Sequence, residues 1–382
     1  MSIETAGQFD KTTIKTNNQA SQQKSLFSPL IDFLCLGGGF LVILLPILLF
    51  LPTDDKTIAT FGVIFLIVAN FINHPHFFHS YQIFYQGFQR KALSDTSPLK
   101  QKYIFAGIMI PAVMIVFFSY CLFAADFILL GYAGNLMAFL VGWHYAKQGY
   151  GMLMVSAVLK RNFFNDSEKR ILLINSYLVW VFSWILTNQI ISERELWGIE
   201  YFTFSVPGWA LWSIGSLMII SSIFVGQIFI RRALTNYTAF PKNGAIAYLT
   251  SLYIWMIAIH IHPALALCIP AFHSLQYLVV IWRFEINKST AEYNADKAAK
   301  IDNPRSLNRR LFIFGTAGII FGSFGFWLFP IVMDFIISRN IEGLSNTAFI
   351  FMFWIFINIH HYFIDNVIWR KENTEVSKYL FS

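Results

Sequence analysis

The chain alternates long apolar runs with short polar segments along almost its whole length. Several runs exceed the roughly 18 to 20 residues that an α-helix needs to cross the hydrocarbon core of a bilayer. The two-residue alternation that is typical of a membrane β-barrel is missing. The pattern therefore predicts an all-α, polytopic transmembrane helical bundle. Its ten expected spans are residues about 28–51, 59–85, 103–124, 127–158, 169–190, 208–230, 244–262, 264–283, 311–334 and 345–369.

The segments between the predicted spans alternate in charge. One set carries clustered lysines and arginines, whereas the other is short and acidic or neutral. Because cytoplasmic segments of membrane proteins are enriched in Lys and Arg, the basic set is expected in the cytoplasm. With an even number of spans, both the N- and the C-terminus are then cytoplasmic. We expect a multi-pass integral protein of a bacterial cytoplasmic (inner) membrane.

The polar segments outside the spans define the expected domain organisation. Residues 1–25 are rich in Gln, Asn and Thr and lack the apolar core of a signal peptide, so they are predicted to be a disordered cytoplasmic tail. Residues 26–371 are predicted to form a single transmembrane domain, and residues 372–382 a second cytoplasmic tail. Within that domain, residues about 285–310 are expected to be a solvated connector, with a short surface helix as the alternative. The net charge of +7 fits basic cytoplasmic loops and does not require nucleic acid as a partner.

All nine histidines lie in predicted spans or at their ends. His79, His273 and His361 each precede a cytoplasmic arginine by 9 to 11 residues, which places them roughly 15 Å from the membrane boundary. Ionisable groups inside a membrane are costly and usually functional, so this set predicts a shared metal or cofactor site at mid-bilayer depth. His260 and His262 either cap an external hairpin or join the site. The candidate metal ligands are His74, His76, His79, His144, His273, His360 and His361.

Polar side chains follow these histidines by three or four residues, the spacing that puts two side chains on one helical face. A ligating imidazole usually donates its other N–H to a carboxylate, carbonyl or amide. Asp365 and the candidate cofactor-binding residues Gln82, Gln148 and Gln276 are therefore expected to orient the imidazoles. Lys147 is expected to pair with Asp365, bind an anionic intermediate or extend to the membrane surface. Lys147 and Asp365 are the candidate catalytic residues.

The donor types narrow the choice of cofactor. Neutral imidazole suits iron, zinc and copper. With one carboxylate and aromatic surroundings, the set favours non-haem iron, mono- or dinuclear, and O2-dependent oxidation of a hydrophobic small molecule or lipid, with a possible electron donor. Three alternatives stay open: a haem b electron-transfer protein, a transporter or proton path, and a purely structural polar network. The similar segments HSLQYLVVIWR and HHYFIDNVIWR, which suggest an internal repeat, favour the transporter.

The histidine pattern resembles two families of integral membrane iron enzymes. The segments HPHFFH and IHHYF are similar to the histidine boxes of fatty-acid desaturases and hydroxylases, although the HxxHH box is missing. Those boxes also lie at the cytoplasmic face. Histidines on several helices within the membrane more closely resemble the Brp/Blh-type β-carotene dioxygenases, which bind iron in this way. The resemblance implies an oxygenase with a lipid or isoprenoid substrate.

Overall fold

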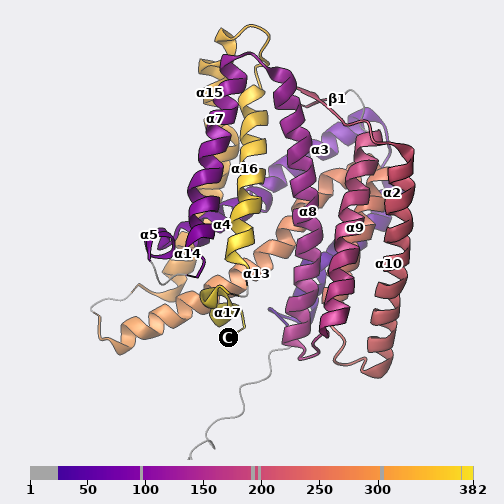
Figure 1. The fold of residues 1–382 in the computed structure, drawn as a ribbon. Helices are drawn as coiled ribbons and strands as arrows, with labels where there is room; N and C mark the ends of the chain where they lie inside the picture. The colour runs from indigo at the N-terminus through magenta and orange to yellow at the C-terminus, as the bar shows by residue number, and fades with distance from the viewer. Residues whose placement is uncertain are drawn as a thin grey trace, which may run out of the picture.

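The computed structural model describes residues 25–94, 98–190, 194–196, 199–301, 305–370 and 372–381. The tail predicted over residues 1–25 therefore lies, except for Ser25, outside the described residues. Within those residues, ten helical segments are long and apolar enough to cross a membrane (Figure 1). The predicted all-α polytopic bundle with ten spans is confirmed, and the chain is a multi-pass membrane protein.

The spans differ in continuity. Five are single helices: α8 (Phe127–Leu159), α9 (Asp166–Ile190), α10 (Gly208–Thr235), α13 (Pro263–Ala298) and α16 (Ala348–Ile368). The others combine shorter pieces: α1 (Pro29–Phe33), η1 (Leu34–Gly38) and α2 (Gly39–Phe50); α3 (Asp55–Ala69) and α4 (Asn73–Tyr85); α6 (Lys100–Ile104), η2 (Phe105–Met109) and α7 (Ile110–Phe123); α11 (Lys242–Leu249), η3 (Thr250–Ile254) and α12 (Trp255–Ile261); α14 (Leu307–Ser323), η4 (Phe324–Leu328) and α15 (Phe329–Ile336). Between the spans lie α5 (Phe88–Leu93), the antiparallel strands β1 (Arg194–Leu196) and β2 (Ile199–Tyr201), and η5 (Ser338–Asn340); α17 (Thr374–Leu380) follows the last span.

The second span is broken between α3 and α4. Pro75 has no N–H to donate to the carbonyl of Phe71, and its ring would clash there in a continuous helix. The Asn70 side chain instead bonds the carbonyl oxygens of Leu66 and Ile67, at 3.1 and 3.3 Å. The break sets α4 apart as an independent helix, and α4 carries three of the histidines.

Residues 285–298 are helical, in agreement with the alternative of a surface helix, but as a continuation of α13 and not as a separate helix. Helix α17 packs against this extension. Glu375 of α17 forms ion pairs with Lys91 at 3.2 Å and with Lys288 of α13 at 3.0 Å. Burial raises the pKa of Glu375, but the two ammonium groups outweigh it and hold that pKa below its usual value. Residues 374–380 are thus a docked helix.

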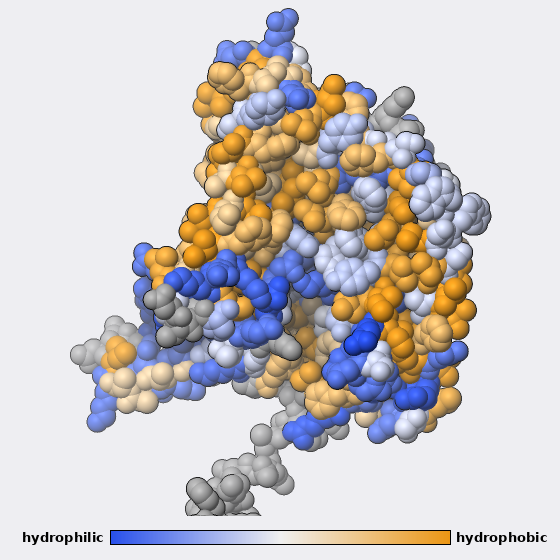
Figure 2. Space-filling view, in the orientation of Figure 1, coloured by the Kyte–Doolittle hydropathy of each residue, from blue (hydrophilic) through white to orange (hydrophobic). Residues whose placement is uncertain are grey.

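The surface agrees with a membrane environment. In Figure 2 apolar side chains cover the flanks of the bundle, and hydrophilic residues gather toward its two ends. Large apolar side chains are exposed, among them Phe123 of α7 at 99% and Trp212 of α10 at 76%. Such extensive apolar exposure is expected where lipid, not water, is the solvent.

Candidate metal centre

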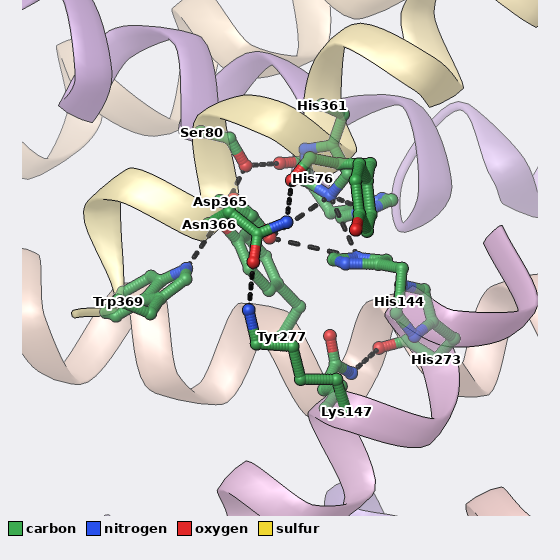
Figure 3. A network of polar contacts seen from close by, with 12 residues as sticks. His76, Ser80, His144, Lys147, His273, Tyr277, His361, Asp365, Asn366 and Trp369 are labelled. Carbon is green, nitrogen blue, oxygen red and sulfur yellow. Dashed lines mark hydrogen bonds and ion pairs between the residues drawn. The ribbon is translucent and has the colours of Figure 1, made fainter. Parts of the chain in front are cut away.

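Three histidines from three helices bring their imidazoles together inside the bundle (Figure 3). Nε2 of His361 in α16 lies 3.2 Å from Nε2 of His76 in α4 and 3.2 Å from Nε2 of His144 in α8. One nitrogen of each residue lies within 4.8 Å of the others. His76 and His361 are fully buried, and the His144 side chain is 11% exposed. We call these three residues the histidine triad.

Two of the three nitrogen pairs in the triad have the spacing of ligands on one shared metal ion, and all three nitrogens lie within 4.8 Å of one another. Imidazole nitrogens bind zinc-like metals at roughly 2.1 Å, so two nitrogens on one ion lie about 3.0 to 3.4 Å apart in octahedral or tetrahedral geometry. The two measured distances of 3.2 Å fall in this range. Nδ1 of His76 lies 2.7 Å from the carbonyl oxygen of Asn73, which can only accept, so Nδ1 carries the hydrogen. Nε2 of His76 then directs a lone pair toward the triad, as a ligand requires.

His273 of α13 borders the triad. The centroid of its ring lies 4.8 Å from that of His144 and 5.4 Å from that of His76, and the ring stacks on Tyr145 at 3.9 Å. Neither ring nitrogen has a hydrogen-bond partner within the described residues, although both are buried. An unsatisfied buried imidazole is costly, so its position beside three others marks it as a candidate fourth nitrogen donor. Its contact with His144 also confirms that these two helices carry histidine at the same level.

Asp365, one turn after His361, faces the triad as the sequence predicts. Its Oδ2 lies 3.4 Å from Nε2 of His361 and 3.8 Å from Nε2 of His144, and accepts no hydrogen bond within the described residues. Its Oδ1 accepts the hydroxyl hydrogen of Tyr277 at 2.5 Å. One oxygen is thus held by the protein, and the other is free to meet a cation beside the imidazoles.

Sequence reasoning missed the residues that hold Asp365. Tyr277 Oη accepts from Trp369 Nε1 at 3.0 Å and lies 2.7 Å from Ser80 Oγ. The signal was present, because Tyr277 follows His273 and Ser80 follows His76 by four residues, the same helical spacing that singled out Asp365. Phenol and indole side chains were overlooked because they are also ordinary in apolar helices.

His360 does not join the triad, contrary to the prediction. Successive helical residues point about 100° apart, so His360 and His361 of α16 face different neighbours. His360 Nε2 donates to the carbonyl oxygen of Ala106 at 3.0 Å, and its Nδ1 lies 2.6 Å from the hydroxyl of Tyr81. Both nitrogens are satisfied, and His360 packs α16 against α4 and η2.

His74 and His79 also lie apart from the triad, because they face the span formed by α14 and η4. The His74 ring stacks on Phe326 at 4.1 Å, and the His79 ring stacks on Phe314 at 4.3 Å. Nδ1 of His79 bonds Oε1 of Gln82 at 2.8 Å, so the predicted pairing exists, but outside the site. Two of the predicted metal ligands are therefore packing residues of the α4–α14 contact.

The remaining amides have a different role from the expected one. Gln148 donates to the backbone carbonyl of His273 at 2.8 Å and to Oε1 of Gln276 at 3.1 Å. Gln276 donates to the carbonyl of Leu36 at 2.7 Å and bonds Ser251. Neither amide bonds an imidazole. They tie α8, α13, η1 and η3 together behind the site, because buried amides take whatever carbonyl partners lie nearest.

The other predicted polar residues are also placed. Lys147 donates to Oδ1 of Asn366 and not to Asp365 (Figure 3). His262 caps α13, accepting from the backbone N–H of Ala264 at 3.1 Å, and its Nε2 lies 3.0 Å from the carbonyl oxygen of Leu51. His260 is exposed. Neither belongs to the triad, which agrees with the hairpin interpretation.

The site combines three convergent imidazole nitrogens, a bordering histidine and a carboxylate oxygen without a hydrogen bond. Such a buried donor set is compatible with a bound metal ion. Comparison of the chain with protein-family models, with curated proteins and with solved structures finds no match.

Proposed function

We propose that this membrane protein is a metalloenzyme with non-haem iron at the histidine triad, and that it carries out O2-dependent oxidation of a lipid or isoprenoid substrate. The observation that carries the proposal is the convergence of three Nε2 atoms from α4, α8 and α16 on one point. Three histidines separated by up to 285 residues in sequence meet there. One N–H of His361 can bond only one of its two neighbouring nitrogens, so hydrogen bonding among the three imidazoles leaves the set incompletely satisfied, whereas a metal ion would bind all three.

The donor set favours iron among the metals that imidazole binds. A carboxylate beside imidazoles is the combination typical of non-haem iron sites that keep open positions for O2 and substrate. Asp365 supplies this carboxylate, with Oδ2 turned to the triad. When bound, iron in such a site activates O2 for oxidation of an unactivated carbon. A mononuclear site needs only the groups described here.

The protein's own part in the chemistry is to fix the donors and exclude water. Asn73 holds the His76 ring by its Nδ1 hydrogen, and Tyr277 holds Asp365 through Oδ1. Phe77 and Tyr145 wall the site, with ring centroids 4.8 Å from that of His361 and 3.9 Å from that of His273. A dry aromatic enclosure within the membrane suits an apolar substrate that arrives from the bilayer.

The geometry disfavours the haem b alternative. Two axial histidines of a haem lie on opposite faces of a flat macrocycle, with the ring between them. Here Nε2 of His361 lies 3.2 Å from both of its neighbours, and a third imidazole occupies the same space. Nitrogens 3.2 Å apart are closer than the roughly 4 Å between two axial nitrogens on one haem iron, which supports the non-haem proposal.

The decisive experiment compares two adjacent histidines. We expect His361→Ala to lower the metal content of the purified protein at least tenfold, because it removes the nitrogen that both other imidazoles face. His360→Ala is the matched control, since it removes the same group from the same buried helix, and it should keep its metal. Elemental analysis measures both variants, and an absorption spectrum of the wild type should lack the sharp Soret band of haem.

Three outcomes would overturn the proposal. Equal metal content in the two variants would return the triad to a packing role. A Soret band would replace non-haem iron by haem. If the iron-loaded protein in native lipid consumes no O2 above the rate of His361→Ala, the oxidation chemistry is wrong even when the metal is present.

A further inference from the structure

Two cations bond the same residue beside the triad, and among the described residues neither has a carboxylate within 4 Å. Lys147, one turn along α8 from His144, donates to the side-chain oxygen of Asn366. Arg370 donates from Nε to the main-chain oxygen of the same Asn366 at 2.8 Å. Both side chains are partly buried, and within the described residues neither forms an ion pair. Asn366 can satisfy hydrogen bonds but brings no negative charge.

The neighbouring carboxylate, Asp365, acts on Lys147 but can offset at most one of these two positive charges. Asp365 directs Oδ1 to Tyr277, and its Oδ2 lies nearest the imidazoles of His361 and His144. A metal dication at the triad would leave the surroundings more positive still. A cation within a span, as Lys147 is, is expensive and usually marks a path or a site for a charged ligand, and Arg370 reaches toward it from beyond the end of α16. The two cations therefore call for an anion from outside the chain.

The seam between α8 and α16 offers space for such a ligand. Gly151 follows Lys147 by one turn, on the same face of α8, and a methyl group added there would meet no atom within 4 Å. In Figure 2 the surface is hollowed between the lower halves of α16 and α8, where hydrophilic residues give way to apolar ones. A headgroup can thus lie at the cations while its chain stays in the apolar part of the seam or in lipid.

We propose that Lys147 and Arg370 bind the anionic headgroup, a carboxylate or phosphate, of an amphiphilic substrate. This inference deepens the proposed function, on which it rests, by naming the substrate class. Both cations bond Asn366, which follows His361 by five residues, a rise of about 7.5 Å along the helix. The headgroup then lies about one and a half helical turns from the level of the triad, so the carbon that reacts is among the carbons closest to the headgroup. Fixing the headgroup holds that carbon in place, which is how remote binding contributes to a reaction.

The test uses three ligands with one chain length: hexadecanoate, hexadecyl phosphate and 1-hexadecanol. Binding to the full-length protein in an uncharged detergent is measured by calorimetry. We expect wild type to bind at least one anion about tenfold or more tightly than the alcohol, and the better anion tells carboxylate from phosphate. Lys147→Met and Arg370→Gln should each lower this preference about tenfold, whereas Lys147→Arg retains most of it. Lys160→Met is the matched control, a lysine at the end of the same helix, and should keep the full preference.

The readouts separate this inference from the metal proposal. Metal content is measured in the same samples and should not change in Lys147→Met or Arg370→Gln, since neither residue contacts the triad nitrogens. If purified wild type contains no metal, the proposed function is wrong. The preference for an anionic headgroup is then still tested, because ligand binding is measured independently of the metal. If the three ligands bind alike, or none binds, the headgroup site is wrong. If Lys160→Met lowers the preference for the anion as much as Lys147→Met does, the preference reflects general attraction between charges, and the proposed headgroup site is wrong.

Discussion

Single residues in this site are oriented by their hydrogen-bond partners more than by their position in the sequence. His360 and His361 are adjacent, yet one is satisfied by Ala106 and Tyr81, and the other turns toward two further imidazoles. Counting residues to the basic ends of the spans predicted a common level for His79, His273 and His361, because helical rise is constant. It could not predict which face each imidazole takes, because that depends on how the helices are rotated against one another.

Tyr277 gives the first prediction at this scale. Tyr277→Phe removes the hydroxyl that holds Asp365 Oδ1 at 2.5 Å, and it leaves Trp369 Nε1 without its acceptor. We expect metal affinity to fall about 10- to 100-fold, the usual cost of losing a partner that orients a metal-binding group. A competition titration with an iron chelator measures this. The control is Tyr85→Phe, which loses a hydroxyl bonded to the carbonyl of Gly107, away from the triad.

Equal affinities in the two tyrosine variants would mean that Asp365 keeps its place without Tyr277. A thermal unfolding curve for each variant shows that the protein is folded before the titration is read. Asp365→Asn is a second measurement, since it preserves shape but removes the charge, and it should weaken metal binding to a similar extent. Unchanged binding there would make Asp365 a packing residue.

Helices could be predicted from the sequence where a long apolar run marks a membrane span. They were harder to predict where packing against another element determines whether a polar segment is helical. The ten spans follow from apolar runs that have no stable alternative in lipid. The continuation of α13 to Ala298 did not follow, because polar residues 285–298 are as suited to a loop as to a helix that pairs with α17 through Glu375 and Lys288. The helical conformation of residues 285–298 therefore depends on contacts with residues far away in the sequence.

The close contact between α14 and α4 leads to a prediction at the scale of elements. A methyl group at Gly318 would lie 2.3 Å from Cε1 of His79, whose ring is fixed by Phe314 and Gln82. Gly318→Ala should therefore destabilise the protein by about 1 to 3 kcal/mol. Gly226→Ala on α10 is the control, because its added methyl meets no atom within 4 Å and the change favours a helix.

Thermal unfolding in detergent compares the two glycine variants. Gly226→Ala should match or slightly exceed wild type, whereas Gly318→Ala should unfold at a lower temperature. If both behave as wild type, α14 moves away from α4 at little cost, and the packing role of His79 is smaller than the geometry indicates.

The whole molecule assembles its candidate site from parts far apart in the chain. His76 and His361 are separated by 285 residues, and His144 and His361 by 217. No local motif holds such a site, so the sequence could indicate its donors but not their grouping. A metal ion bound there would join α4, α8 and α16, and would link the first half of the bundle to its last helix.

The predicted orientation of the molecule can be tested by labelling. Asp54 and Arg305 are exposed and lie at predicted opposite sides of the membrane. In intact cells, a membrane-impermeant maleimide should label Asp54→Cys, and should label Arg305→Cys only after permeabilisation. Background is low because Cys121 and Cys268 are buried and Cys35 is partly buried. The reverse labelling pattern would invert the bundle, and labelling of both sites from one side would contradict an even alternation of the spans.

The two hydrogen bonds of His360 have a mechanical consequence for the residue beside it. These bonds connect α16 to Tyr81 of α4 and to Ala106 of η2, and so they restrict rotation of the last span about its helix axis. At the outer radius of a helix, about 5 to 6 Å, a rotation of 10° moves a side-chain tip by about 1 Å. That is roughly the error at which a constellation of ligands stops working. His360 is thus one of several contacts that limit rotation of α16, beside the buried Phe351 and Ile355, so its loss alone should leave His361 aligned with its partners.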